Sequence, residues 1–152
     1  MQSTLFMICG LPGSGKTTIA KQLENEHSAL RFSPDEWILA LHGHELERPE
    51  RNAVRDPMEA LQWSVAKRAL SVGCNVVLDW GFWSKEERTK YRTEAESIGA
   101  KVKVIFLNVP LEELWKRISN RPESLKGTLH ITQEELEEWS HMFEAPTPDE
   151  LN

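Results

Sequence analysis

The sequence is poor in cysteine and has no long apolar run. Its two cysteines, Cys9 and Cys74, lie in apolar surroundings without a Cys or His partner at metal-ligand spacing, so we expect buried free thiols, not a disulfide framework or a zinc site. No apolar stretch approaches the roughly 20 residues of a membrane span. The short one at the N-terminus has no basic leader or cleavage site. We therefore expect a cytoplasmic protein without a membrane partner.

An excess of basic charge is also missing. Against 24 acidic residues the chain has 18 basic ones, a formal net charge of -6. This balance argues against broad adhesion to nucleic acid or to an anionic membrane, although a local basic patch is compatible with it. A chain of 152 residues with 39% hydrophobic and 28% charged residues has the composition of one globular domain, and no repeat or linker divides it. We predict a single domain over residues 1–152.

Short apolar runs alternate with helical patterns along the chain. Strands are predicted at residues 4–9, 30–33, 75–78 and 101–107. Capping boxes predict where two of the intervening helices begin, at Ser84 with Glu87 and at Thr132 with Glu135. This alternation predicts the α/β class, with a mainly parallel sheet of about four to five strands between two helical layers. Ligands of such folds bind at the carboxyl ends of the strands.

The stretch between the second and third predicted strands has two parts. Residues 42–57 are polar and contain two prolines, which predicts a mobile surface insert. Beyond them, apolar residues recur at spacings of three and four and predict a helix whose core-facing residues are Met58, Leu61, Val65, Ala69 and Val72.

A phosphate-binding loop follows the first predicted strand. The segment GLPGSGKT at residues 10–17 matches the pattern G-x-x-x-x-G-K-[ST] at every fixed position. The glycines allow backbone N–H groups to surround phosphate oxygens, Lys16 brings a cation to the β- and γ-phosphates, and the Thr17 hydroxyl can ligate Mg²⁺. The loop therefore predicts a three-layer P-loop NTPase fold and a site for ATP and Mg²⁺ made of Gly10, Leu11, Pro12, Gly13, Ser14, Gly15, Lys16, Thr17 and Thr18.

Two aspartates are predicted to face this loop. Asp79 directly follows an apolar run, a position from which a carboxylate can hold Mg²⁺ through water, although strand-terminal aspartates also serve as turn residues. Asp35 follows the second predicted strand, where an acceptor hydroxyl approaches the γ-phosphate. We predict Asp35 as the general base and as a second metal contact. The alternative is that Asp35 only supplies negative charge to a helix that starts at Pro34.

Two arginines are candidates for binding the triphosphate. Arg117 and Arg121 lie four residues apart on or just beyond a predicted helix, and can converge on phosphate oxygens when the glycine-containing segment 122–128 closes as a lid. The alternative is that both are solvated surface residues.

The chain has six tryptophans. We predict that Trp37, Trp80 and Trp83, which flank Asp35 or Asp79, form walls of the acceptor pocket, with Trp37 and Trp83 contacting the substrate. Trp115 and Trp139 lie at core-facing helical spacing, and for them we expect a packing role.

Several of these segments together resemble a known family. The loop at 10–17, the Asp35 segment, the run that ends at Asp79 with Glu86–Arg88 beyond it, and Val109–Arg117 resemble, in the same order, segments of the P-loop kinases. These include the kinase domain of bacteriophage polynucleotide 5′-hydroxyl kinase, the zeta toxins and chloramphenicol phosphotransferase, and small ATP-binding proteins named after the AAA family are the most similar. The resemblance covers nearly the whole chain.

The resemblance implies a set of roles. It implies Asp35 as the base, Thr17 as a Mg²⁺ ligand, and Asp79 as a carboxylate that orients the acceptor or the metal. Lys16 and Arg121 are implied as phosphate binders, and the tail at residues 143–148 as a border of the adenine site.

One departure bears on the acceptor. Where polynucleotide kinase has an arginine for an acceptor phosphate, three residues after its catalytic aspartate, this chain has Ile38. With the acidic charge and the tryptophans, this favours a Mg-ATP-dependent phosphotransferase acting on a hydroxyl of a small molecule. A nucleic-acid 5′-hydroxyl kinase is the second hypothesis. The third is an ATP-dependent switch or regulatory binding module in which Asp35 is dispensable.

Overall fold

The sheet is built from four short runs of buried apolar residues. The computed structural model describes residues 2–43, 45–120 and 131–151. Its strands are β1 (Thr4–Cys9), β2 (Ala29–Phe32), β3 (Asn75–Gly81) and β4 (Lys101–Phe106). They lie in the order β2-β3-β1-β4, and every neighbouring pair is parallel. The four predicted strands are therefore confirmed, with β3 longer than expected because it includes Asp79.

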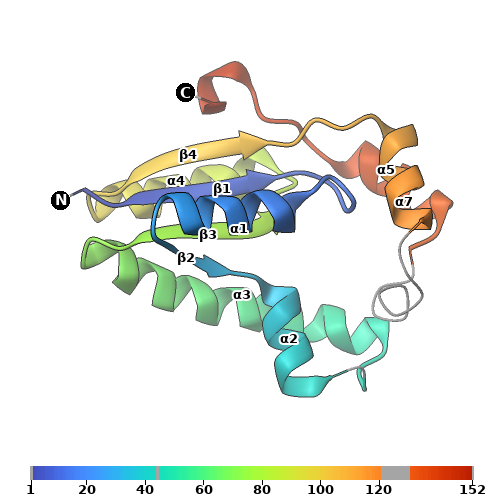
Figure 1. Cartoon of the computed structure of the whole chain (residues 1–152), viewed down its shortest axis with the longest axis horizontal. Coiled ribbons are helices and arrows are strands. Elements are labelled where there is room, and N and C mark those ends of the chain that lie inside the picture. Colours follow the sequence, from blue (N-terminus) through green and yellow to red (C-terminus); the bar gives the residue numbers. More distant parts are fainter. Residues whose placement is uncertain (1, 44, 121–130, 152) are drawn as a thin grey trace.

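Helices cover both faces of this sheet (Figure 1). Phe6 and Ile8 of β1 pack against the first helix, whereas Leu5 and Met7 point to the opposite face, as the two-residue period of a strand requires. The helices are α1 (Lys16–Glu26), α2 (Pro34–His42), α3 (Arg48–Ser71), α4 (Lys85–Ser97), α5 (Leu111–Ser119) and α7 (Gln133–Met142), followed by the 3-10 helix η1 (Pro148–Leu151). The sheet lies between α1 on one side and α3 with α4 on the other, which confirms the α/β three-layer arrangement.

The start of α3 corrects the predicted surface insert. Residues 48–57 are helical, although this segment contains two prolines. Pro49 lies in the first turn, where a backbone N–H has no helical partner to lose, and a capping box joins Glu47 to Glu50. Pro57 lies inside the helix, at a cost of about 3 kcal/mol that the packing of α3 must offset. The N-terminal turns of α3 therefore extend beyond the carboxyl edge of the sheet (Figure 1).

The core-facing side of α3 also differs from the prediction. Met58 and Ala69 are buried as expected, but Leu61, Val65 and Val72 are exposed. The buried stripe instead includes Gln62 and Trp63, and Gln62 Nε2 donates a hydrogen bond to the Ser33 carbonyl oxygen at 3.0 Å.

No helix in the described ranges, the 24-residue α3 included, has the length and apolarity needed to span a bilayer.

A buried ion pair fastens the C-terminal segment to the rest of the fold. Arg88 of α4 is 1% exposed, and its Nε donates to Glu150 Oε1 at 2.8 Å. The backbone N–H and the hydroxyl of Thr147 also donate to Glu150. Arg88 Nη1 donates to the carbonyl oxygen of Phe82, just beyond β3, at 2.8 Å. One guanidinium thus connects α4, the exit of β3 and η1.

This ion pair predicts an acid-sensitive contribution to stability. Burial alone would raise the pKa of the Glu150 carboxyl, but the hydrogen bonds and charge of Arg88 and the hydrogen bonds of Thr147 outweigh it and lower the pKa to about 2, from 4.5. The folded pKa is the lower one, so the stabilisation is complete above pH 4.5 and is lost as the pH falls toward 2. Glu150→Gln is expected to lower the free energy of unfolding by about 3 kcal/mol at neutral pH, measured by urea denaturation.

Glu138→Gln is the matched control, because Glu138 is exposed on α7 and should change stability by no more than about 0.5 kcal/mol. Equal stability of the two variants at neutral pH would show that the buried pair contributes nothing.

Candidate active site

A cleft of about 1110 Å³ lies at the carboxyl ends of the strands. Its walls come from the glycine-rich loop, α2, the first turns of α3, the end of β3, α5 and α7. The predicted site residues that line it are Pro12, Gly13, Gly15, Lys16, Thr17, Thr18, Asp35, Asp79, Trp83 and Arg117. Gly10, Leu11 and Ser14 belong to the loop but not to the cleft wall, and Arg121 and the predicted lid at 122–128 lie outside the described residues.

The glycine-rich loop has the geometry of an anion cradle. Gly13 and Gly15 have φ angles of 85° and 94°, in the left-handed region that glycine adopts readily. No side chain caps the N-terminus of α1, so its first N–H groups are directed toward the loop, where a phosphate can accept from them. Lys16 Nζ donates to the Leu11 carbonyl oxygen at 3.0 Å, which lays the side chain across the loop. These features fit the triphosphate of ATP.

Helix α5 packs directly on this loop. The side chain of Ile118 and the carbonyl oxygen of Leu114 lie so close to Gly13 that an added Cβ would meet them at 3.0 and 3.2 Å. Arg117 Nη1 donates to the Gly13 carbonyl oxygen at 3.2 Å, and its Nε donates to Glu113. The guanidinium thus lies beside the loop, where the predicted role of Arg117 as a phosphate clamp requires it.

Asp79 is buried at the side of the cleft next to β2. It is 7% exposed, and burial raises the pKa of its carboxyl to about 6, although the positive charge of Arg31 opposes the rise. Arg31 Nη1 lies 4.0 Å from Asp79 Oδ2, and the same guanidinium pairs with Glu24 and Glu36. Arg31 cannot be predicted from the sequence, because a single arginine in a short strand matches no motif.

Asp35 is held by a residue of α3. Arg55 Nη1 donates to Asp35 Oδ1 at 2.9 Å, while its Nε donates to Glu59 and its Nη2 to the Trp80 carbonyl oxygen. Burial raises the pKa of Glu59 to about 7, and the charge of Arg55 lowers it only in part. A role for Arg55 could not be predicted while residues 42–57 were expected to form a surface insert, because only a helix from residue 48 onward directs this side chain into the cleft.

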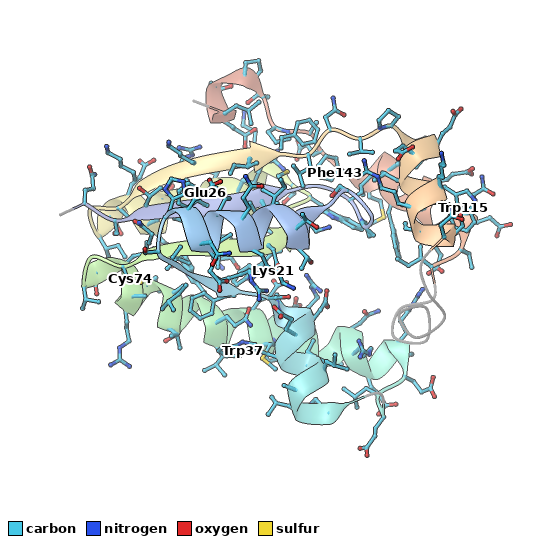
Figure 2. All side chains as sticks on the ribbon, in the orientation of Figure 1. Lys21, Glu26, Trp37, Cys74, Trp115 and Phe143 are labelled. Atoms are coloured by element: carbon cyan, nitrogen blue, oxygen red, sulfur yellow. The ribbon has the colours of Figure 1, made fainter. Side chains whose placement is uncertain are left out.

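The tryptophans divide between the cleft and the core. Trp83 and Trp139 both line the cleft, with ring centroids 5.8 Å apart, so Trp139 does more than the packing predicted for it. Trp80 lines the cleft but is buried and stacks on Phe82. Trp37 does not line the cleft. Its ring lies 5.9 Å from that of Phe32, and Figure 2 shows it on the side of α2 that faces α3.

The cleft also presents oxygen atoms suited to Mg²⁺. Thr17, Asp35 and Asp79 all line it and provide a hydroxyl and two carboxylates, the oxygen ligands that Mg²⁺ prefers. Within the described ranges, no three His, Cys, Asp or Glu side chains lie close enough together to form a metal site of their own. A Mg²⁺ ion bound mainly through substrate phosphates needs only one or two protein ligands, so these residues fit such an ion.

The tail expected to border the adenine runs along the end of β4 and beside the cleft residue Trp83, whose carbonyl oxygen accepts a hydrogen bond from the Glu144 N–H at 2.7 Å. Phe143 stacks on Phe106 at the end of β4, with ring centroids 5.8 Å apart, and none of residues 143–148 lines the cleft.

The expectation of a buried free thiol is confirmed for Cys9, whereas the thiol of Cys74 is only half-buried. Burial raises the pKa of the Cys9 thiol to about 11.

Comparison with known proteins supports this assignment of the fold. A family model described as an AAA domain matches residues 5–146. No curated protein shows significant sequence similarity to the chain.

Solved structures share the whole arrangement of the chain. A protein of Chloroflexus aurantiacus superposes with a TM-score of 0.78 at 18% identity, over 97% of this chain and 83% of that one. A chain of the Pnkp1/Rnl/Hen1 RNA repair complex gives 0.76 at 22% identity over 93% of this chain, which spans only 44% of that longer one. The APS kinase of Mycobacterium tuberculosis, in complex with AMPPNP and APS, gives 0.59 at 18% identity, over 86% and 77%. These matches confirm the P-loop NTPase fold.

The contact of α5 with the loop predicts the effect of adding one methyl group. Gly13→Ala introduces a Cβ at a positive φ and against Ile118, so we expect Mg-ATP affinity to fall at least about tenfold, measured by isothermal titration calorimetry. The control is Gly99→Ala, because Gly99 has a φ of 87° but open space around it. That variant should lose about 1–2 kcal/mol of stability and keep its affinity for ATP. Unchanged ATP binding by Gly13→Ala would show that the loop is not the nucleotide site.

Proposed function

The chain belongs to the AAA domain family, and from this premise we propose that it is a Mg-ATP-dependent kinase that phosphorylates a hydroxyl of a small molecule. The observation that supports this best is that Asp35 and the glycine-rich loop line the same cleft. A phosphate loop alone would serve an ATPase or a GTPase equally well, whereas a carboxylate beside the acceptor position is what transfer to a hydroxyl requires. The shared fold of an APS kinase that binds AMPPNP supports the same chemistry.

The donor side of the cleft would bind the triphosphate. The N–H groups at the start of α1, Lys16 and Arg117 would contact its phosphate oxygens. Thr17 and Asp79 would hold Mg²⁺, which, when bound, neutralises part of the phosphate charge. Arg31, whose Nη1 lies 4.0 Å from Asp79 Oδ2, would favour the charged form of that carboxylate.

The acceptor side would orient the hydroxyl and take its proton. The acceptor oxygen forms a bond to the γ-phosphorus, the bond from that phosphorus to the bridging oxygen of ADP breaks, and the proton passes to Asp35. Arg55 holds Asp35 in position through the 2.9 Å hydrogen bond. The transition state of phosphoryl transfer is loose, so orientation matters more here than the strength of the base.

Two features favour a small acceptor over a nucleic acid. Ile38, which is 2% exposed, lines the cleft where the resemblance would place an arginine for an acceptor phosphate. The net charge of -6 also disfavours a polyanion. A nucleic-acid substrate would make affinity fall steeply as salt rises, because counterions are released on binding. We expect only weak binding to 5′-hydroxyl oligonucleotides, with little salt dependence.

Asp35→Asn separates a kinase from an ATP-dependent switch. We expect transfer of the γ-phosphate to pooled small-molecule acceptors to fall at least about a hundredfold, the upper range of a general-base contribution, with ATP affinity unchanged. ADP formation and calorimetric titration measure the two quantities. Glu137→Gln is the control, because Glu137 is exposed on α7 and lies outside the cleft. Full turnover by Asp35→Asn would remove Asp35 as the base.

Lys16→Ala tests the donor half independently. Loss of this cation should lower both ATP affinity and turnover, because Lys16 contacts the transferred phosphate. Lys21 of α1 supplies the control Lys21→Ala, since it lies beyond the cleft and is exposed. If the Lys16 and Lys21 variants bind ATP equally well, the donor assignment is wrong.

A further inference from the structure

A row of basic side chains on α3 forms one wall of the cleft. Arg48, Arg51 and Arg55 lie at spacings of three and four residues, and all three line the cleft. Like charges at these spacings repel one another, by about 0.2–0.5 kcal/mol per pair. Two of the three arginines are compensated, since Arg48 pairs with Glu135 across the cleft and Arg55 pairs with Asp35 and Glu59.

Arg51 differs from its two neighbours. In the described part of the chain it makes no ion pair and donates no side-chain hydrogen bond, and its Nη2 nitrogen is buried without a partner. A buried donor of this kind costs about 1–3 kcal/mol, and more when it is charged. A buried polar group usually has a partner, which is either protein, an ordered water or a ligand. Because Arg51 lines the cleft, a ligand bound there can supply that partner.

The position of Arg51 on α3 is suited to contact with the acceptor and not with ATP. It lies one helical turn before Arg55, about 6 Å along the axis of α3, and Arg55 contacts Asp35. The expected contacts of the triphosphate instead come from the loop and from α5. A molecule with its hydroxyl at Asp35 can therefore extend along α3 and bring a second group to Arg51.

We propose that Arg51, together with the amide of Asn52, is the subsite for an anionic group on the acceptor. A guanidinium can bind a carboxylate or a phosphate through two parallel hydrogen bonds, and Asn52, which also lines the cleft, can donate a further one. Three carboxylates also line the cleft nearby, those of Asp56, Glu59 and Glu87. They repel an anion, so the anionic group of the acceptor would bind at Arg51 and not beside them. The inference rests on the proposed kinase function and narrows its substrate to a compact hydroxy compound bearing a carboxylate or a phosphate.

Matched sets of acceptors test the subsite. The three-carbon set is glycerol, glycerate and glycerol 3-phosphate, and the six-carbon set is glucitol, gluconate and glucitol 6-phosphate. Binding is measured by calorimetry with the loop saturated by Mg²⁺ and AMPPNP, so that no probe occupies the phosphate loop. We expect at least one charged member to bind about tenfold or more tightly than its neutral counterpart, and the member that does so identifies carboxylate or phosphate.

Two variants locate the effect. Arg51→Gln should reduce the affinity for the charged member to that for the neutral one. Arg68→Gln should leave it unchanged, because Arg68 is exposed on the same helix and lies outside the cleft. The subsite is refuted if charged and neutral members bind alike in both sets, or if the two variants behave alike.

A transfer assay with Mg-ATP separates this inference from the proposed function. If Arg51-dependent binding is found but the bound compound is never phosphorylated, the subsite stands and the kinase assignment fails. If a neutral member is phosphorylated and Arg51→Gln has no effect on it or on the charged members, the kinase assignment stands and the subsite fails.

Discussion

The buried guanidinium of Arg88 is the contact on which the site depends most. It is inaccessible to solvent, and it holds the Glu150 carboxylate, the Phe82 carbonyl oxygen and, at 3.8 Å, the Cys9 sulfur. Phe82 has a φ of 46°, a conformation that a bulky residue adopts only when its surroundings impose it. Breaking a buried charge pair costs several kcal/mol, so this contact can hold the strained turn. The exit of β3 is fixed as a result.

That fixed exit connects the two halves of the cleft. Gly10 N–H donates to the Gly81 carbonyl oxygen at 3.0 Å, which ties the start of the phosphate loop to the end of β3. Asp79 lies two residues before Gly81 on the same strand, and Trp83 lies two residues after it. The relative positions of loop, carboxylate and cleft wall therefore follow from one short segment. Arg88 of α4 and Glu150 of η1, which do not line the cleft, set its geometry.

Local patterns predicted the glycine-rich loop and the starts of two helices, whereas tertiary contacts decided the wall of the cleft that α3 forms. The loop at 10–17, the capping box at Thr132 and the helix start at Ser84 are predicted correctly because short segments determine their own conformation, although at Ser84 only the serine's own capping bond forms. The two prolines of residues 42–57 predicted a surface insert, whereas residues 48–57 are the first turns of α3. The core-facing side of α3 was missed because the polar Gln62 is buried, and the acceptor of its hydrogen bond lies far away in the sequence.

The same distinction applies to charge. Arg31 and Arg55 match no motif, yet in the fold Arg55 is hydrogen-bonded to Asp35 and the charge of Arg31 lies 4.0 Å from Asp79. Arg51 could not be predicted as a site residue either. What marks it is that its Nη2 has no partner within the described chain, although Arg51 lines a cleft rich in carboxylates. Ion pairs between distant residues become visible only when the helices are in place.

The central claim is that one cleft brings ATP and a small hydroxyl compound together. The most direct measurement follows the labelled γ-phosphate of Mg-ATP into separate pools of metabolites, antibiotics and 5′-hydroxyl oligonucleotides. We predict label in a phosphate ester of a small molecule, dependent on Asp35 and Lys16. Label found only in inorganic phosphate, or only in the oligonucleotides, would contradict it.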